Sequence, residues 1–288
     1  MEGPRGIYAP VATIFDSEGG LDLPRFQSNL NFYASSDLDG VVILGSNGES
    51  ALLETDEKLR LIEAGAQAIG GRRKGMAGVG LESTRATIEL GKRAAARVAD
   101  PFLADATAYR NHYEAVADAS PVPILIYVMA AYTGVDLASS LVVQLSAHPN
   151  IVGVKDSGGN APKVAEMIAG AAPGFSVLAG SANFLYPALC LGATGGIVAL
   201  GNIAPGQCKE IQRRFEAGDH DGARELQFKL LAPNAVVTSK YGIAGLKTAL
   251  EAVGLEGGEP RSPLRPLTET EAEDVRKTLN EAGIGRVR

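Results

Sequence analysis

Short apolar runs recur along the first two hundred residues, and each is followed by a polar turn and a stretch with helical spacing of apolar positions. A short apolar run between turn residues is typical of a parallel strand that is buried on both faces. Strands that alternate with helices form parallel sheets through right-handed crossovers, so the pattern predicts an α/β protein. The runs cover residues 7–13, 41–45, 75–80, 124–127, 151–155, 176–180 and 195–200.

Two of the intervening helices have recognisable starts. Thr55 precedes DEKLRLIEAGAQAI and Ser83 precedes TRATIELGKRAAARVA, and both hydroxyls are suited to an N-cap. Asp56 and Glu57 would favour the positive end of the first of these helices.

Seven strands, with room for an eighth between residues 99 and 104, predict a (β/α)₈ TIM barrel. The fourth strand is expected to be weak or incomplete, because 99–105 contains no β-rich run. An open doubly wound sheet is the alternative, which the lack of GxGxxG after the first strand disfavours. Helical patterns fill 205–283. We therefore expect a barrel over 1–216 and an appended C-terminal helical region over 217–288, packed on the barrel.

Composition narrows the possible partners. Of 288 residues 45% are hydrophobic, which is ample for a core, and the net charge is −6. No basic stretch is dense enough for a phosphate backbone, so we expect no nucleic-acid partner. No run of 18 apolar residues and no signal peptide is visible, so we expect a cytoplasmic protein that binds no membrane. Cys190 and Cys208 have no metal-site spacing, and Cys190 is expected in the core.

Lys155 ends the apolar run IVGVK and is followed by Asp156 and small residues. The carboxyl ends of barrel strands carry the chemistry in such enzymes. Burial there disfavours the charged ammonium, and a neutral amine can attack a ketone to form a Schiff base. The alternative is a solvated loop lysine without a catalytic role.

The other strand ends carry small polar residues and a tyrosine. Each has an ordinary structural explanation, since Ser46 and Asn47 suit turns and Tyr127 could be a packed aromatic ring. Together they would face one opening, which indicates a site. The strand-end residues are Thr13, Gly45 to Ser50, Tyr127, Lys155, Ser181, and Gly195 to Ile197.

GSNGES, Tyr127 with the TG that follows it, VKDSGG, LAGSA and GATGG occur in this order. This set resembles the dihydrodipicolinate synthase and N-acetylneuraminate lyase family from about residue 6 to about residue 283. PNIVGVKDSGG, VLAGSANFL and PNAVVTSKYGIAGLK are most similar to the 4-hydroxy-2-oxoglutarate aldolases within it. The resemblance implies a class I aldolase on a (β/α)₈ barrel, with pyruvate as the Schiff-base partner. It also implies a homo-oligomer, a tetramer or dimer, with neither a metal nor an organic cofactor.

The resemblance assigns roles to individual residues. Lys155 would form the imine, Tyr127 would transfer protons, and Ser46 would link Tyr127 to a proton relay. Ser46 and Asn47 would hold the substrate carboxylate. The substrate-binding set carried over from the resemblance is Asn47, Gly45, Ser181 and Ile197.

The chain departs from the family at three places. The synthases usually place an arginine for aspartate semialdehyde where this chain has Tyr132, and the turn Val128 to Ala130 replaces a common Asn and Pro. Residues 99–105 lack the family's fourth strand and its nearby tyrosines, and Tyr109 lies in a helical pattern. Arg110 or a neighbouring subunit could supply the missing cation.

The expected reaction is cleavage of 4-hydroxy-2-oxoglutarate, or a similar 2-oxo-3-deoxy acid, to pyruvate and an aldehyde. The alternatives are a dihydrodipicolinate synthase, a related 2-oxo sugar-acid dehydratase, and a non-catalytic pyruvate-binding relative. A metal-dependent aldolase would need clustered ligands, but His112, His148 and His220 lie in helical or helix-end patterns and none ends a strand.

Overall fold

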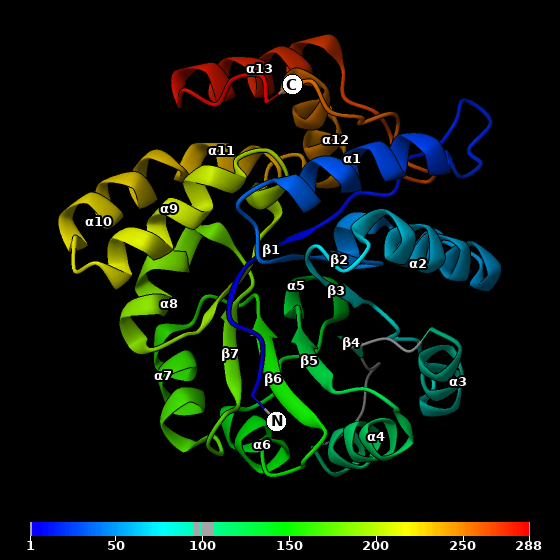
Figure 1. Cartoon of the computed structure of the whole chain (residues 1–288), viewed down its shortest axis with the longest axis vertical. Helices are drawn as coiled ribbons and strands as arrows, with labels where there is room; N and C mark the ends of the chain where they lie inside the picture. The colour runs from blue at the N-terminus through cyan, green and yellow to red at the C-terminus, as the bar shows by residue number, and fades with distance from the viewer. Residues whose placement is uncertain (1, 95–97, 100–105, 288) are drawn as a thin grey trace. The chain divides into compact units, whose positions relative to one another are not determined.

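The structure is a computed structural model that describes residues 2–94, 98–99 and 106–287 (Figure 1). The chain divides into two compact units, and each is described by itself. The first unit contains the residues up to Gly6 and Met76–Ile197, and the second contains Ile7–Gly75 and Val198–Arg288.

The first unit is a parallel sheet with helices along it. Its strands lie in the order β8-β7-β6-β5-β4, and the pairings from β4 to β8 are all parallel. Figure 1 shows helices α6 and α7 beside strands β5 to β7. The strands are β4 (Val98–Ala99), β5 (Ile124–Val128), β6 (Ile151–Asp156), β7 (Ser176–Ala179) and β8 (Gly195–Ile197), and the helices are α3 (Thr84–Ala94), α4 (Ala106–Ala119), α5 (Ala130–Thr133), α6 (Ser139–Leu145), α7 (Ala161–Gly170) and α8 (Leu185–Leu191).

Local sequence explains helix α7, which packs beside β7. The side chain of Asn160 caps the helix by accepting from the Lys163 N–H at 3.1 Å, and Pro162 in the first turn needs no N–H partner. Val164 and Met167, three residues apart, bury one face of the helix in the core of this unit.

Two glycines allow close packing of strands in the first unit. A Cβ on Gly153 would lie 2.5 Å from the carbonyl oxygen of Ser176 in β7. A Cβ on Gly195 would lie 2.0 Å from the carbonyl oxygen of Gly6, and its φ of +150° also favours glycine. The glycines in VGV and TGG therefore relieve packing between strands.

The second unit contains the N-terminal strands and the C-terminal helices. Strands β1 and β2 pair in parallel, with Tyr8 opposite Gly40, and β3 adjoins β2. The strands are β1 (Gly6–Pro10), β2 (Gly40–Ile43) and β3 (Lys74–Ala77, at the boundary of the units), and the helices are α1 (Leu23–Ser35), α2 (Thr55–Ile69), α9 (Pro205–Glu216), α10 (His220–Lys229), α11 (Leu231–Val236), α12 (Gly242–Ala252) and α13 (Glu269–Glu281).

The seven expected strands are confirmed within a few residues of their predicted bounds. The eighth is β4, whose two described residues pair with Leu125 and Ile126 of β5. Most of the segment expected to hold it, from 100 to 105, lies outside the described residues. The five C-terminal helices confirm the helical patterns of 205–283, while the domain boundary at residue 216 stays a prediction.

Of the two expected helix starts, one is confirmed. The Ala86 N–H donates to the Ser83 Oγ at 3.1 Å, as an N-cap requires. The prediction for Thr55 is wrong, because Glu54 occupies the N-cap of α2 and Thr55 is the first helical residue. The Glu57 carboxylate reaches back to accept a hydrogen bond from the Glu54 N–H at 2.9 Å. This capping box joins Glu54 and Glu57 and does not involve Thr55.

The cysteines differ from expectation in one case. Cys190 in α8 is exposed, so its placement in the core is wrong. Cys208 in α9 is buried, and burial raises the pKa of its thiol to about 12. Among the described residues, none of the helices has the length and apolar character needed to cross a membrane.

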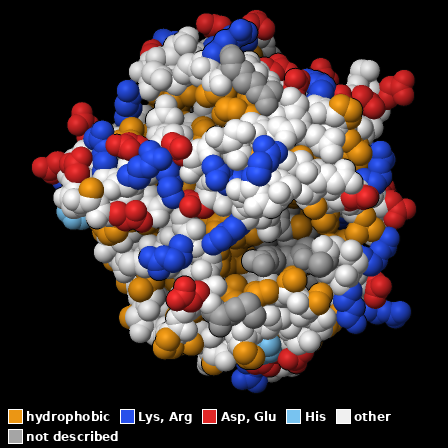
Figure 2. Space-filling view, in the orientation of Figure 1, with side chains coloured by type: hydrophobic (Ala, Val, Ile, Leu, Met, Phe, Trp, Pro, Cys, Tyr) orange, Lys and Arg blue, Asp and Glu red, His pale blue; other side chains and the backbone are white. Residues whose placement is uncertain are grey.

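Charged side chains of both signs are interspersed on the face shown in Figure 2. This face therefore carries no uniform field of one sign.

Candidate active site

Lys155 and Tyr127 face each other on adjacent strands of the first unit. They are direct partners in the register of β6 and β5, so their side chains project from the same face of the sheet. The Lys155 Nζ lies 4.2 Å from the centroid of the Tyr127 ring, and each residue is only 8% exposed. The sequence prediction that these two residues meet at strand ends is confirmed, and their catalytic roles stay a prediction.

The strand ends around Lys155 are joined by backbone hydrogen bonds. The Ser157 N–H donates to the Val128 oxygen at 3.0 Å, and the Gly180 N–H donates to the Asp156 oxygen at 2.7 Å. A Cβ on Gly180 would lie 2.7 Å from the Asp156 carbonyl oxygen, a backbone atom, so this close approach of β7 to β6 favours glycine. The ends of β5, β6 and β7 are thus held together just beyond Lys155.

Ser181 and Ile197 also lie in the first unit. Ser181 follows β7 and is half-buried, and its Oγ accepts from the Asn183 N–H at 3.3 Å. Ile197 is the last residue of β8 and is 1% exposed. In the sheet, Leu178 of β7 lies between Lys155 of β6 and Gly195 of β8, since it pairs with both.

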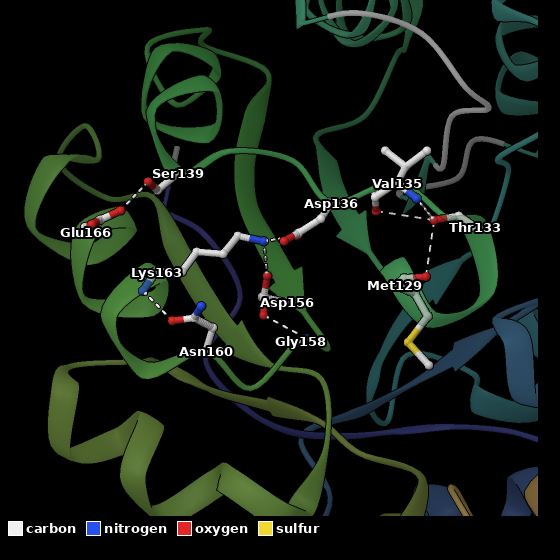
Figure 3. Close-up of polar contacts among 10 residues, drawn as sticks. All are labelled: Met129, Thr133, Val135, Asp136, Ser139, Asp156, Gly158, Asn160, Lys163 and Glu166. Carbon is white, nitrogen blue, oxygen red and sulfur yellow. Dashed lines mark hydrogen bonds and ion pairs between the residues drawn. The ribbon is translucent and has the colours of Figure 1, made fainter.

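Asp156 lies next to Lys155 in the strand, and its side chain meets α7 instead (Figure 3). Its Oδ2 lies 2.9 Å from the Lys163 Nζ, and its Oδ1 accepts from the Gly158 N–H at 2.9 Å. Lys163 also pairs with Asp136 in the loop after α5. Burial opposes the positive charge of Lys163, but the hydrogen bonds that its amine donates to Asp136 and Asp156 outweigh this effect and raise the pKa of the amine.

Lys163 therefore ties the loop after Tyr127 to the strand that carries Lys155. Sequence reasoning did not identify Asp156 or Lys163. The alternation of side chains along a strand could have indicated that Asp156 faces the helix layer, where a buried carboxylate needs a cation.

The turn after Tyr127 has an ordered backbone. The Thr133 hydroxyl donates to the Met129 oxygen at 3.2 Å and accepts from the Val135 N–H at 3.1 Å, as Figure 3 shows. Gly134, at φ +71°, ends the short helix α5 in the left-handed conformation. The Thr-Gly pair after the tyrosine is thus a structural stop for this turn.

Tyr132 lies on α5 with 63% of its surface exposed. Desolvation and the nearby Tyr127 both raise the pKa of its phenol, and the exposure limits the first effect. Arg110 was named from the sequence as a possible replacement for the arginine that is missing at Tyr132. It lines a cavity of about 140 Å³ between α4 and α6, and none of the expected site residues lines this cavity.

Gly45, Ser46 and Asn47 belong to the second unit, in the turn after β2. All three are half-buried, and Ser46 begins a turn of 3₁₀ helix that ends at Gly48. The Thr13 hydroxyl donates to the Gly48 oxygen at 2.6 Å, which fixes this turn against the segment after β1. The approach of these residues to Lys155 and Tyr127 stays a prediction.

The histidines lie where the sequence indicated. His112 is in α4, where its Nδ1 lies 2.9 Å from the Thr84 Oγ1 and burial lowers its pKa. His148 pairs with Asp118 at 3.1 Å, and His220 begins α10. Within the part of the chain that the structure describes, no three His, Cys, Asp or Glu side chains form a group that could hold a metal ion.

Comparisons with known proteins cover almost the whole chain. Residues 3–282 match the model of the dihydrodipicolinate synthetase family. A probable mitochondrial 4-hydroxy-2-oxoglutarate aldolase from Emericella nidulans is 32% identical, over 96% of this chain and 94% of the relative. A 4-hydroxy-tetrahydrodipicolinate synthase from Exiguobacterium is 33% identical, over 92% of this chain and 93% of the relative.

The fold is shared with solved structures. A prophage protein of the dihydrodipicolinic acid synthase family from E. coli K12, solved in complex with pyruvate, superposes with a TM-score of 0.92. It is 27% identical and covers 97% of this chain and 99% of its own. The parallel α/β barrel with C-terminal helices, expected from the strand pattern, is therefore confirmed, and the chain belongs to the dihydrodipicolinate synthetase family of Schiff-base lyases and aldolases.

Proposed function

We propose that this protein is a pyruvate-dependent class I aldolase that cleaves 4-hydroxy-2-oxoglutarate, or a similar 2-oxo-3-deoxy acid, through an imine on Lys155. The observation that carries the proposal is the buried amine of Lys155 above the ring of Tyr127. The fungal aldolase relative and the pyruvate complex of the prophage protein support it.

The chemistry follows from these two side chains. The neutral amine of Lys155 would attack C2 of the 2-oxo acid, and loss of water from the carbinolamine would give a protonated imine. The imine would accept the electron pair of the C3–C4 bond as the C4 hydroxyl loses its proton, which releases an aldehyde and leaves an enamine. Protonation of C3 and hydrolysis of the imine would then free pyruvate and Lys155. Tyr127 is the group proposed to move these protons.

Ser46 and Asn47 are proposed to bind the carboxylate next to the reacting ketone. A hydroxyl, a side-chain amide and backbone N–H groups supply several fixed donors, which can hold a carboxylate without an arginine. Ser46 would also connect Tyr127 to a proton relay.

Tyr132 supports the choice of substrate. It lies on α5, which follows the strand that carries Tyr127. This is the position where the synthases would carry an arginine for the carboxylate of aspartate semialdehyde. A tyrosine cannot form a forked pair with a carboxylate, and each missing charged hydrogen bond is worth about 1.5–3 kcal/mol. Condensation of pyruvate with aspartate semialdehyde is therefore proposed to be slower by roughly tenfold to hundredfold for each such bond.

The second candidate is a 4-hydroxy-tetrahydrodipicolinate synthase, which the Exiguobacterium relative supports as strongly on sequence identity. Coupled assays that compare kcat/KM for cleavage of 4-hydroxy-2-oxoglutarate and for condensation with aspartate semialdehyde separate the two. We expect cleavage to be preferred, and we expect Tyr132→Arg, but not Tyr132→Phe, to improve condensation. If the unmodified protein prefers aspartate semialdehyde, the protein is a synthase and the proposed aldolase function is wrong.

A further inference from the structure

A buried ion pair lies just after the Ser46–Asn47 turn in the second unit. The Glu49 Oε1 is 2.8 Å from the Nζ of Lys247 on α12, and the two side chains are 0% and 1% exposed. The Lys247 Nζ also donates to the Glu259 oxygen at 2.8 Å and lies 4.5 Å from the centroid of the Phe15 ring. Lys247 is thus enclosed by one carboxylate, one carbonyl and one aromatic face.

The second oxygen of Glu49 is also held. It accepts from the Arg261 N–H at 2.7 Å, and the Arg261 guanidinium binds both oxygens of Glu57, at 2.7 Å each. The same guanidinium donates to the Leu52 oxygen at 3.0 Å and lies 4.3 Å from the Phe15 ring centroid. Glu49 and the residues that follow it are therefore fixed to one charged network.

The backbone of this turn is in a conformation that side chains disfavour. Leu44 and Glu49, which flank Gly45 to Gly48, have φ angles of 61° and 55°. Residues with a Cβ rarely occupy this left-handed region, and they do so where the surroundings hold them there. The Glu49 N–H donates to the Ser46 oxygen at 3.0 Å, so the placement of Glu49 is transmitted directly to Ser46.

We propose that Lys247 is a positioning residue: through its ion pair with Glu49 it holds the Gly45–Gly48 turn in the conformation that presents Ser46 and Asn47 to the substrate carboxylate. The inference rests on the proposed function, which assigns those two residues to the carboxylate. Stability alone gives little reason for the pair, because replacement of a buried ion pair by apolar residues is often neutral or stabilising. Burial lowers the pKa of Lys247, and the neighbouring Glu49 opposes this shift by favouring the charged amine.

The experiment measures how pyruvate concentration controls borohydride trapping on Lys155. Lys247→Met removes the cation and keeps most of the side-chain volume, but it leaves Glu49 buried and unpaired. The control is Lys240→Met, which removes an exposed lysine paired with Asp274 at 2.8 Å a few residues before α12. Thermal unfolding of each variant identifies a temperature at which all remain folded.

We expect Lys247→Met to raise the half-saturating pyruvate concentration by roughly tenfold or more, while trapping at saturation still reaches the level of the parent protein. Lys240→Met should leave half-saturation unchanged. Adding Glu49→Gln to Lys247→Met should recover part of the affinity, because the unpaired charge is then removed. If Lys247→Met does not fold, Glu49→Gln alone should raise half-saturation without a loss of maximal trapping.

The outcomes separate the inference from the proposed function. Half-saturation that stays unchanged in the folded variants, even with a lower melting temperature, would show a purely structural pair and overturn the inference alone. Absence of any adduct on Lys155 in the unmodified protein would overturn the proposed function and this inference with it.

Discussion

The amine of Lys155 and the phenol of Tyr127, the proposed nucleophile and proton carrier, lie on one pair of neighbouring strands. Tyr127→Phe keeps the aromatic ring below the amine and removes only the hydroxyl. We expect kcat to fall by a factor of roughly 10² to 10⁴, the usual range for a positioned acid or base, with little change in the KM for pyruvate. Steady-state kinetics with pyruvate as the varied substrate measure both constants.

Asn47→Ala is the matched substitution, because Asn47 is assigned to binding and not to proton transfer. It should chiefly raise the KM for pyruvate, since it removes an interaction made equally in the ground and transition states. A fully active Tyr127→Phe variant would contradict the proposed proton relay.

Single residues also mark the limit of sequence reasoning at the site. Lys155 was predictable because it ends an apolar run, and Tyr127 because it lies near the end of an expected strand, since strand ends of parallel sheets meet at one edge. The partners of Glu49 could not be predicted from the sequence. Arg261, for example, lies 212 residues away, and no periodic pattern links the two residues. Buried ion pairs between distant segments depend on tertiary packing, which leaves no local signal.

At the scale of elements, helix α2 is tied to the segment after α12 by Glu57 and Arg261. The hydrogen bonds from Arg261 hold the pKa of Glu57 below its usual 4.5, although burial opposes the shift. A carboxyl with a lowered pKa in the folded state contributes stability that is present above about pH 4.5 and is lost as the pH falls through the folded value. We expect the melting temperature to fall in this acid range.

Melting curves between neutral and acidic pH test this expectation. Glu57→Gln should lower the melting temperature at neutral pH and flatten its decline below about pH 4.5. Gln67→Ala, an exposed change on the same helix, should leave the decline as it is in the parent protein. An acid decline of the same steepness in Glu57→Gln would exclude this pair as its source.

The elements themselves were predictable to different degrees. The strands followed from continuous apolar runs, which are typical of a sheet buried on both faces, and the C-terminal helices followed from the helical spacing of apolar positions. The start of α2 was misplaced by one residue because a glutamate three residues into the helix, and not the threonine, completes the cap. Strand β4 was difficult to predict because the sequence from 99 to 105 contains no β-rich run.

For the whole molecule, the sequence motifs and the comparisons agree on the family, and the fold follows from it. Substrate choice does not follow in the same way, because the fungal aldolase and the bacterial synthase relatives are equally similar to this chain. Specificity among 2-oxo acids depends on a few contacts in loops, such as the one Tyr132 would make.

The central claim is that Lys155 forms an imine with pyruvate. Incubation of the purified protein with pyruvate and borohydride, followed by peptide mass spectrometry, measures this directly. The account predicts a reduced pyruvate adduct on the peptide that contains Lys155 and its loss in Lys155→Ala. An adduct on another residue, or one that persists in Lys155→Ala, would contradict it.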